Sequence, residues 1–134
     1  MNRNLFRCVR RRAGERCEYC RLPAACYPAP FQADHVIARY HGGATESDNL
    51  ALACIHCNRY KGPNIAGVDP DSGELVRLFH PRRDDWIEHF AWSGTRLSGL
   101  TAVGRATIQV LHINGPEMVE LRGALAEEGL REWI

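Results

Sequence analysis

Two cysteine pairs with identical spacing constrain the fold of this chain more than any other feature. Cys17 and Cys20 form the first C-x2-C pair, and Cys54 and Cys57 form the second. A C-x2-C turn places two thiolates on one side of a knuckle, and two such turns can supply the four soft donors that zinc prefers. The insert of residues 21–53 is longer than the usual spacing of a zinc ribbon, so the metal is expected to join the ends of an inserted unit.

A redox-active dithiol is the alternative role for such pairs. One C-x2-C pair suffices for that chemistry, and neither pair follows a recognisable strand-to-helix turn. We therefore predict a closed structural zinc site formed by all four cysteines. Cys8 and Cys26 fit neither pair and are interpreted as ordinary buried or loop cysteines.

Length and composition indicate one folded domain. The chain has 134 residues, of which 45% are hydrophobic and 25% are charged, as is usual for globular proteins. No apolar run approaches the roughly 20 residues that span a membrane, and the basic N-terminus lacks the apolar core of a signal peptide. We expect a single domain over residues 1–134, located in a reducing cytoplasm without membrane contact, as a monomer or weak homodimer.

The charge is unevenly distributed although its net value is only +1. Residues 1–21 carry seven arginines and two glutamates, whereas the C-terminal half is acidic. Clustered arginines favour a phosphate-rich partner because they displace counterions from nucleic acid. A solvated helix face is the alternative, and charge alone does not decide between the two.

Periodicity and turn residues predict a mixed α and β structure. Two short strands and a helix are expected within the core motif of residues 17–61, and the segment of about 84–134 is expected to be a helical extension. The predicted helices are residues 3–13, a segment ending at Gly62, a short helix through Phe90, residues 102–112 and a helix from Pro116; the predicted strands are residues 31–38, a short one after Asn49, and residues 75–79.

The insert also carries the groups that phosphodiester hydrolysis requires. His35 can act as a base because histidine is the side chain that ordinarily changes charge near neutral pH, and Asn49 could orient its imidazole by a hydrogen bond. Asp34 and Asn58 offer hard oxygen donors suited to Mg²⁺ or Mn²⁺. Neighbouring strand residues point to opposite faces, so Asp34 and His35 can serve one phosphate only if the backbone bends or the phosphate reaches both sides. Taken singly, each residue also has an ordinary structural explanation.

Taken together, residues 17–61 resemble the HNH endonuclease family, whose fold is a ββα-metal finger. The pattern is two C-x2-C pairs enclosing Asp34-His35 and Asn49, with Asn58 and Lys61 after the last cysteine. The resemblance implies an α+β fold in which a four-cysteine zinc site (Cys17, Cys20, Cys54 and Cys57) staples the finger. It implies that His35 is the base, that Asn49 orients it, and that Asp34 and Asn58 bind the catalytic ion. Many members carry a histidine where Asn58 stands, and an amide oxygen there shifts the expected metal to Mg²⁺ or Mn²⁺.

The function implied by this resemblance is metal-dependent cleavage of DNA. The remainder of the chain is similar to a sub-group of small bacterial HNH proteins, notably at Phe79–Arg83 and Trp86, and is expected to pack on the finger and shape a DNA groove. Arg59, Lys61, Arg82 and Arg83 are the predicted DNA contacts. Weak sequence selectivity is expected, since no base-reading element can be recognised. The alternative is a non-catalytic zinc-stapled module that binds nucleic acid or protein.

Overall fold

A computed structural model describes residues 1–131 and residue 133, and it begins with the predicted N-terminal helix. Helix α1 covers Arg3–Arg12 and is capped by the side chain of Asn2, whose oxygen accepts a hydrogen bond from the Leu5 amide at 2.8 Å. Three arginines in its last turn favour the helix because positive charge there opposes the helix dipole. Val9 is the buried residue through which α1 enters the core.

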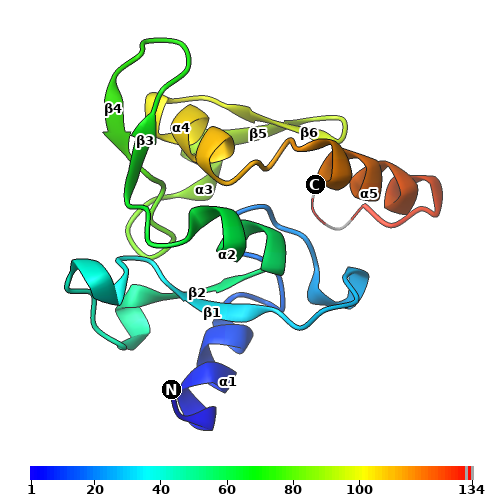
Figure 1. Cartoon of the computed structure of the whole chain (residues 1–134). Helices are drawn as coiled ribbons and strands as arrows, with labels where there is room; N and C mark the ends of the chain where they lie inside the picture. The colour runs from blue at the N-terminus through cyan, green and yellow to red at the C-terminus, as the bar shows by residue number, and fades with distance from the viewer. Residues whose placement is uncertain (132, 134) are drawn as a thin grey trace.

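The central unit is a ββα arrangement, as predicted. Strand β1 (Gln32–His35) pairs with β2 (Leu50–Ala53) in an antiparallel hairpin, and α2 (Ile55–Lys61) follows β2 after one residue. All four residues of β2 are buried, because α1 and α2 lie on opposite sides of the hairpin (Figure 1). Helix α2 ends where Gly62 adopts a positive φ of 50°, in agreement with the predicted stop.

Strand β1 is shorter than the predicted strand of residues 31–38. The chain bends directly after His35, where the side chain of Asn49 binds both backbone polar groups of Ile37. Three turns of 3-10 helix lie between the longer elements: Ala24–Cys26, Arg39–His41 and Ser47–Asn49.

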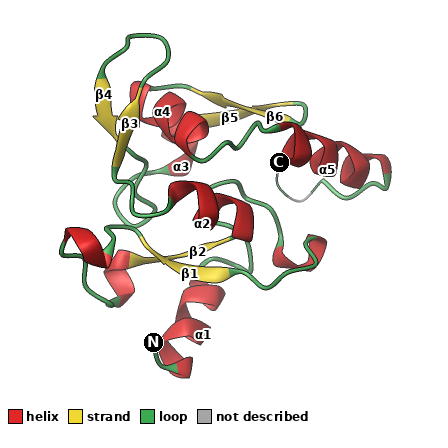
Figure 2. Cartoon of the chain, viewed as in Figure 1, coloured by secondary structure: helices red, strands yellow, loops and turns green. Residues whose placement is uncertain are grey.

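The C-terminal part contains two further hairpins and three helices within the described residues (Figure 2). Helices α4 and α5 agree closely with prediction, and α5 has Pro116 in its first turn. The predicted strand at 75–79 ends earlier, at Arg77. The bounds are β3 (Ala66–Val68), β4 (Leu75–Arg77), α3 (Trp86–His89), β5 (Phe90–Ser93), β6 (Arg96–Gly99), α4 (Ala102–Val110) and α5 (Pro116–Glu127).

The prediction of a helical extension over about 84–134 was wrong at residues 90–99, which form two strands. Phe90 was expected to continue a helix from Trp86, but its backbone is extended and it begins β5. The hairpin turns at Gly94, which has a φ of 61°. Strand β6 then packs on α4. Gly99 lies so close to the Arg105 backbone that a Cβ on residue 99 would be 2.5 Å from the Arg105 amide nitrogen. Long-range packing therefore outweighed the short helical pattern.

One contiguous core joins the finger to the C-terminal part. It includes Leu52 of β2, Phe79 after β4, and Phe90 of β5, together with the four cysteines of the two C-x2-C motifs. Tyr19 packs edge-on against Phe79 with ring centroids 6.5 Å apart, and the Trp86 indole donates a hydrogen bond to the Tyr19 carbonyl at 2.9 Å. The C-terminal part thus packs on the finger, as expected. Among the described residues, no helix is both long and apolar enough to cross a membrane.

Candidate functional site

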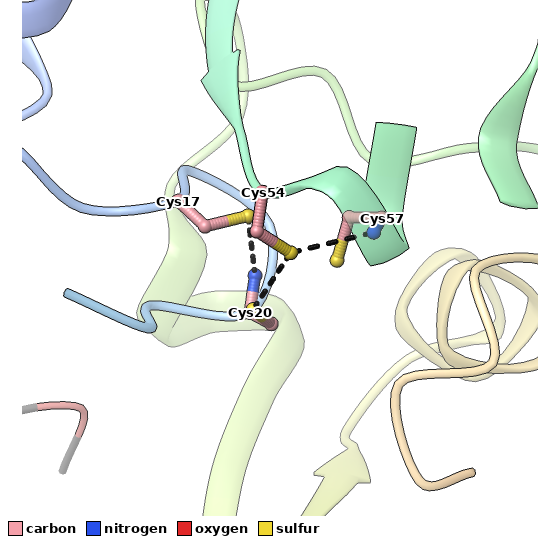
Figure 3. Close-up of side chains that lie close together, drawn as sticks. All are labelled: Cys17, Cys20, Cys54 and Cys57. Atoms are coloured by element: carbon pink, nitrogen blue, oxygen red, sulfur yellow. Dashed lines mark hydrogen bonds between the residues drawn. The ribbon is translucent and has the colours of Figure 1, made fainter. Parts of the chain in front are cut away.

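The four cysteines of the two C-x2-C motifs converge on one buried point (Figure 3). Their sulfur atoms all lie within 4.8 Å of one another, and none of the four is more than 1% exposed. The sulfur atoms of Cys20 and Cys54 are separated by 3.8 Å. Four thiolates at about 2.3 Å from a tetrahedral zinc ion would be about 3.8 Å apart. The predicted convergence of the two knuckles is confirmed, and its size fits zinc.

Local hydrogen bonds prepare both knuckles for a cation. The amide of Cys20 donates to the Cys17 sulfur at 3.5 Å, and the amide of Cys57 donates to the Cys54 sulfur at 3.3 Å. Burial raises the pKa of the Cys17 thiol, but hydrogen bonds from the other three cysteines outweigh burial and hold that pKa well below its usual range. The same contacts with Cys17 raise the pKa of Cys57. Thiolates are the form of cysteine that binds zinc, so a divalent cation at this point would allow all four sulfur atoms to ionise together.

A buried arginine from α5 adds positive charge near this cluster. Arg122 is 0% exposed and donates to the carbonyls of Thr95 at 2.7 Å and Ile113 at 2.9 Å. Burial lowers the pKa of its guanidinium, while the negative charge of three cluster cysteines opposes that shift. Its Nη1 is buried and has no hydrogen-bond partner among the described residues. Nothing in the sequence pattern indicated this residue.

On the face of β1 that meets α2, Asp34 and Lys61 form a buried ion pair. The Lys61 ammonium lies 3.1 Å from Oδ2 of Asp34 and also donates to the His35 carbonyl at 3.1 Å. Tyr19 donates its hydroxyl to the same carboxylate at 2.7 Å. Burial raises the pKa of Asp34 and outweighs the lowering by Lys61 and Tyr19. Lys61, predicted to contact DNA, is only 1% exposed and is therefore occupied inside the finger.

Asn58 lies one helical turn before Lys61 on α2 and faces the same strand. Its amide nitrogen donates to the side-chain oxygen of Gln32 at 2.6 Å. Gln32 and Asp34 share one face of β1 because side chains alternate along a strand. The two predicted oxygen ligands, Asp34 and Asn58, therefore lie on facing elements, although no direct contact joins them. Gln32 was not identified from the sequence.

His35 occupies the last position of β1 and has a partner that was not predicted. Its Nε2 lies 2.8 Å from the hydroxyl of Thr45. The prediction that Asn49 orients His35 by a hydrogen bond was wrong. The Asn49 amide instead accepts from the Ile37 amide at 2.9 Å and donates to the carbonyls of Ile37 at 3.0 Å and Ala44 at 2.9 Å. Asn49 thus fixes the loop that follows His35, and Thr45, at the end of that loop, contacts the imidazole.

Only part of the predicted DNA-contacting set is available at the surface. Arg59 and Arg83 are exposed. Arg82 is 12% exposed and forms an ion pair with Glu18, whose second carboxylate oxygen accepts from the Leu52 amide. Arg82 therefore ties the 80–83 turn to the first knuckle and is not free for a phosphate.

Comparison with known proteins gives one result. Residues 17–64 match the family model described as HNH endonuclease. Those residues contain the two knuckles, the β1–β2 hairpin and α2, so the resemblance stated from the sequence is confirmed for this segment. Searches of curated proteins and of solved structures found no match to the chain.

Proposed function

We propose that this protein is a metal-dependent DNA endonuclease in which His35 activates the attacking water. The observation that carries the proposal is the position of His35 at the end of β1, held by Thr45, within a ββα finger whose facing elements carry Asp34 and Asn58. The match of residues 17–64 to the HNH endonuclease family supports the same chemistry. A module that only binds DNA would not require a base together with two oxygen donors.

In the proposed mechanism, Nδ1 of His35 accepts the proton of the water that attacks the phosphorus, one ester P–O bond breaks, and the leaving alkoxide takes a proton from solvent. Nε2 lies 2.8 Å from the Thr45 hydroxyl, which can accept a hydrogen bond, and the mechanism uses the tautomer in which Nε2 carries the proton and donates it to that oxygen. This tautomer leaves Nδ1 unprotonated and able to act as the base. Thr45 takes the orienting role that was first assigned to Asn49. Asn49 supports it indirectly by fixing the loop that carries Thr45.

Asp34 and Asn58 are the proposed ligands of the catalytic Mg²⁺ or Mn²⁺ ion. Their oxygens are hard donors, and the amide oxygen of Asn58 is not used in the Asn58–Gln32 hydrogen bond. A bound divalent ion would neutralise charge that develops on the phosphate. Lys61 already neutralises Asp34, so we propose that the lysine shares the carboxylate with the ion and keeps Asp34 ionised although burial raises its pKa.

The four-cysteine cluster is proposed to bind structural zinc. Its thiolates are soft donors that retain zinc strongly, and all four positions are closed to solvent, as in structural sites. The two ions should therefore be separable by mild chelation. Contact with the DNA backbone is assigned to exposed arginines: Arg59, Arg83, and Arg3, Arg7 and Arg11 of α1.

The proposal is tested by incubating purified protein with supercoiled plasmid and Mg²⁺ or Mn²⁺, with EDTA as control. Nicking that requires the added ion, by protein with near-stoichiometric zinc, is the expected result. Asn58→Ala should retain zinc but require a higher Mg²⁺ concentration for the half-maximal rate. Cys57→Ser should lose zinc and unfold at lower temperature. Repeated failure of zinc-loaded protein to cut DNA would favour the alternative of a binding module.

A further inference from the structure

An exposed aromatic side chain stands on the loop that joins His35 to Asn49. Tyr40 is 87% exposed, the highest fraction among the exposed large hydrophobic residues of the described structure. Arg39 and His41 flank it, and both are exposed. None of these three side chains is buried in the core. A large apolar ring left in water between an arginine and a histidine has no evident role in folding.

The loop that carries Tyr40 is held by many hydrogen bonds, which distinguishes it from an ordinary mobile surface loop. Asn49 makes three hydrogen bonds to its two ends. The amides of His41 and Gly43 both donate to the Ala38 carbonyl, at 2.9 and 3.0 Å. Gly43 has no room for a Cβ, which would meet the Ile37 carbonyl and, at 2.8 Å, the Asn49 amide. Tyr40 is therefore presented on a preorganised support.

The same loop is attached to the proposed base at both ends. His35 immediately precedes it in the chain, and Thr45 at its far end contacts the imidazole. In Figure 1 the loop, coloured cyan to teal, projects beyond the β1–β2 hairpin on the side away from α5. A DNA strand whose phosphate reaches His35 would pass next to this projection. The positive charge of Arg39 complements that strand.

Rigid exposed aromatic rings bind nucleic acid by stacking on a base, and flanking cations hold the backbone. The ring of His41 lies 5.2 Å from that of Tyr40 at an interplanar angle of 89°, so it supports Tyr40 without stacking on it. In a continuous duplex both faces of each base are already covered by neighbouring bases. A free face is available only where a base is unpaired, because moving such a base out of the stack costs the least free energy.

We propose that the segment Arg39–Gly42 binds an unpaired nucleotide next to the cleaved phosphate, with Tyr40 stacked on its base. The preferred substrate is thus DNA with a flap, gap or bulge near the cleavage position. This inference rests on the proposed function for the position of the scissile phosphate. Stacking does not read base identity, which agrees with the weak sequence selectivity expected from the sequence.

Binding to two hairpin duplexes tests the proposal without requiring turnover. One duplex contains a single unpaired 2-aminopurine, and the other is fully paired with 2-aminopurine at the same position. Affinity and 2-aminopurine fluorescence are measured with Ca²⁺ in place of Mg²⁺. The parent should bind the unpaired substrate more tightly and quench its fluorescence. Tyr40→Ala should weaken that binding by about 5- to 150-fold, the range of one base–aromatic stack.

Matched variants separate stacking from other effects. Tyr40→Trp retains a stacking surface and should keep both the preference and the quenching. Leu75→Ala removes an apolar side chain that is 73% exposed on β4 and should bind like the parent. The proposal is overturned if Tyr40→Ala leaves both affinities unchanged or lowers both equally. Plasmid nicking by the parent is measured separately. Failure of the nuclease proposal would appear in the nicking assay, whereas failure of the stacking proposal would appear in the binding assay.

Discussion

Lys61 and Asp34 face each other across the finger in an ion pair that solvent scarcely reaches. The two side chains are 1% and 5% exposed, and the ammonium lies 3.1 Å from the carboxylate. Lys61 also holds the carbonyl of His35. One lysine on α2 thus neutralises a proposed metal ligand and fixes the backbone of the proposed base, which links the stability of the finger to its chemistry.

Removal of Lys61 should expose the cost of an unpaired buried carboxylate. We expect Lys61→Met to lower the free energy of unfolding by about 3 kcal/mol, because breaking one side of a buried pair leaves the other charge uncompensated. Asp34→Asn combined with Lys61→Met should recover most of that loss. Urea unfolding of the two single variants and the double variant gives the coupling energy. Additive losses in the double variant would show that the pair is not coupled.

Thr45 and Asn49 should differ in the kind of defect that their loss causes. Thr45→Val removes only the hydroxyl that contacts His35, so the nicking rate should fall while the melting temperature stays within about 2 °C of the parent, as for a surface substitution. Asn49→Ala removes three hydrogen bonds to the loop and should lower the melting temperature as well. Thermal melts and nicking rates on both variants check this. An unchanged nicking rate in Thr45→Val would refute the orienting role of Thr45.

Structural features that depend on residues close together in the sequence could be predicted, whereas features that depend on distant residues could not. Cysteine spacing was sufficient to predict the four-cysteine cluster, and Gly62 and Pro116 were sufficient to place helix boundaries. Arg82 illustrates the opposite case. Its partner Glu18 is distant in sequence, so nothing near Arg82 could indicate that it is paired and not free for DNA. Thr45 was likewise missed, because only the loop folded by Asn49 brings its hydroxyl to His35. The β5–β6 hairpin depends on packing against α4, which a local helical pattern does not reveal.

Arg122 should influence the affinity of the cysteine cluster for zinc. Four thiolates around Zn²⁺ carry a net charge of about −2, and a buried guanidinium nearby offsets part of it. We expect Arg122→Met to weaken zinc binding by about 10-fold, in the range seen for outer-shell partners of metal sites. Competition with a chromophoric chelator measures this affinity. Arg105→Met, which removes an arginine paired with Asp69, is the control and should retain zinc like the parent. Equal zinc affinity in Arg122→Met would show that its charge does not act on the cluster.

The Asp69–Arg105 pair should make stability depend on acid pH. Two hydrogen bonds from Arg105, at 2.9 and 3.0 Å, hold the pKa of Asp69 well below its usual range. A carboxyl whose pKa is lowered on folding contributes stability above its unfolded pKa of about 3.9, and loses it as pH falls through the folded value. The melting temperature of the parent should therefore exceed that of Asp69→Asn by a constant amount from pH 7 to about 5. The difference between the two melting temperatures should become smaller below about pH 4.

Asp71→Asn is the matched control for that experiment. Asp71 also lies near Arg105, at 3.1 Å, but its side chain is 71% exposed. Exposed ion pairs contribute little, so this variant should melt like the parent at every pH. A gap between the parent and Asp69→Asn that stays constant down to pH 2 would contradict the assignment of the lowered pKa.

The rate of plasmid nicking by His35→Ala, relative to the parent at equal zinc content, tests the central claim most directly. The imidazole is half-buried and its hydrogen bond is to Thr45, so its removal should leave the melting temperature and zinc content nearly unchanged. Loss of a positioned base should lower the Mg²⁺-dependent rate by roughly 10²- to 10⁴-fold. A variant that is folded, retains zinc and nicks DNA at the parent rate would contradict the account.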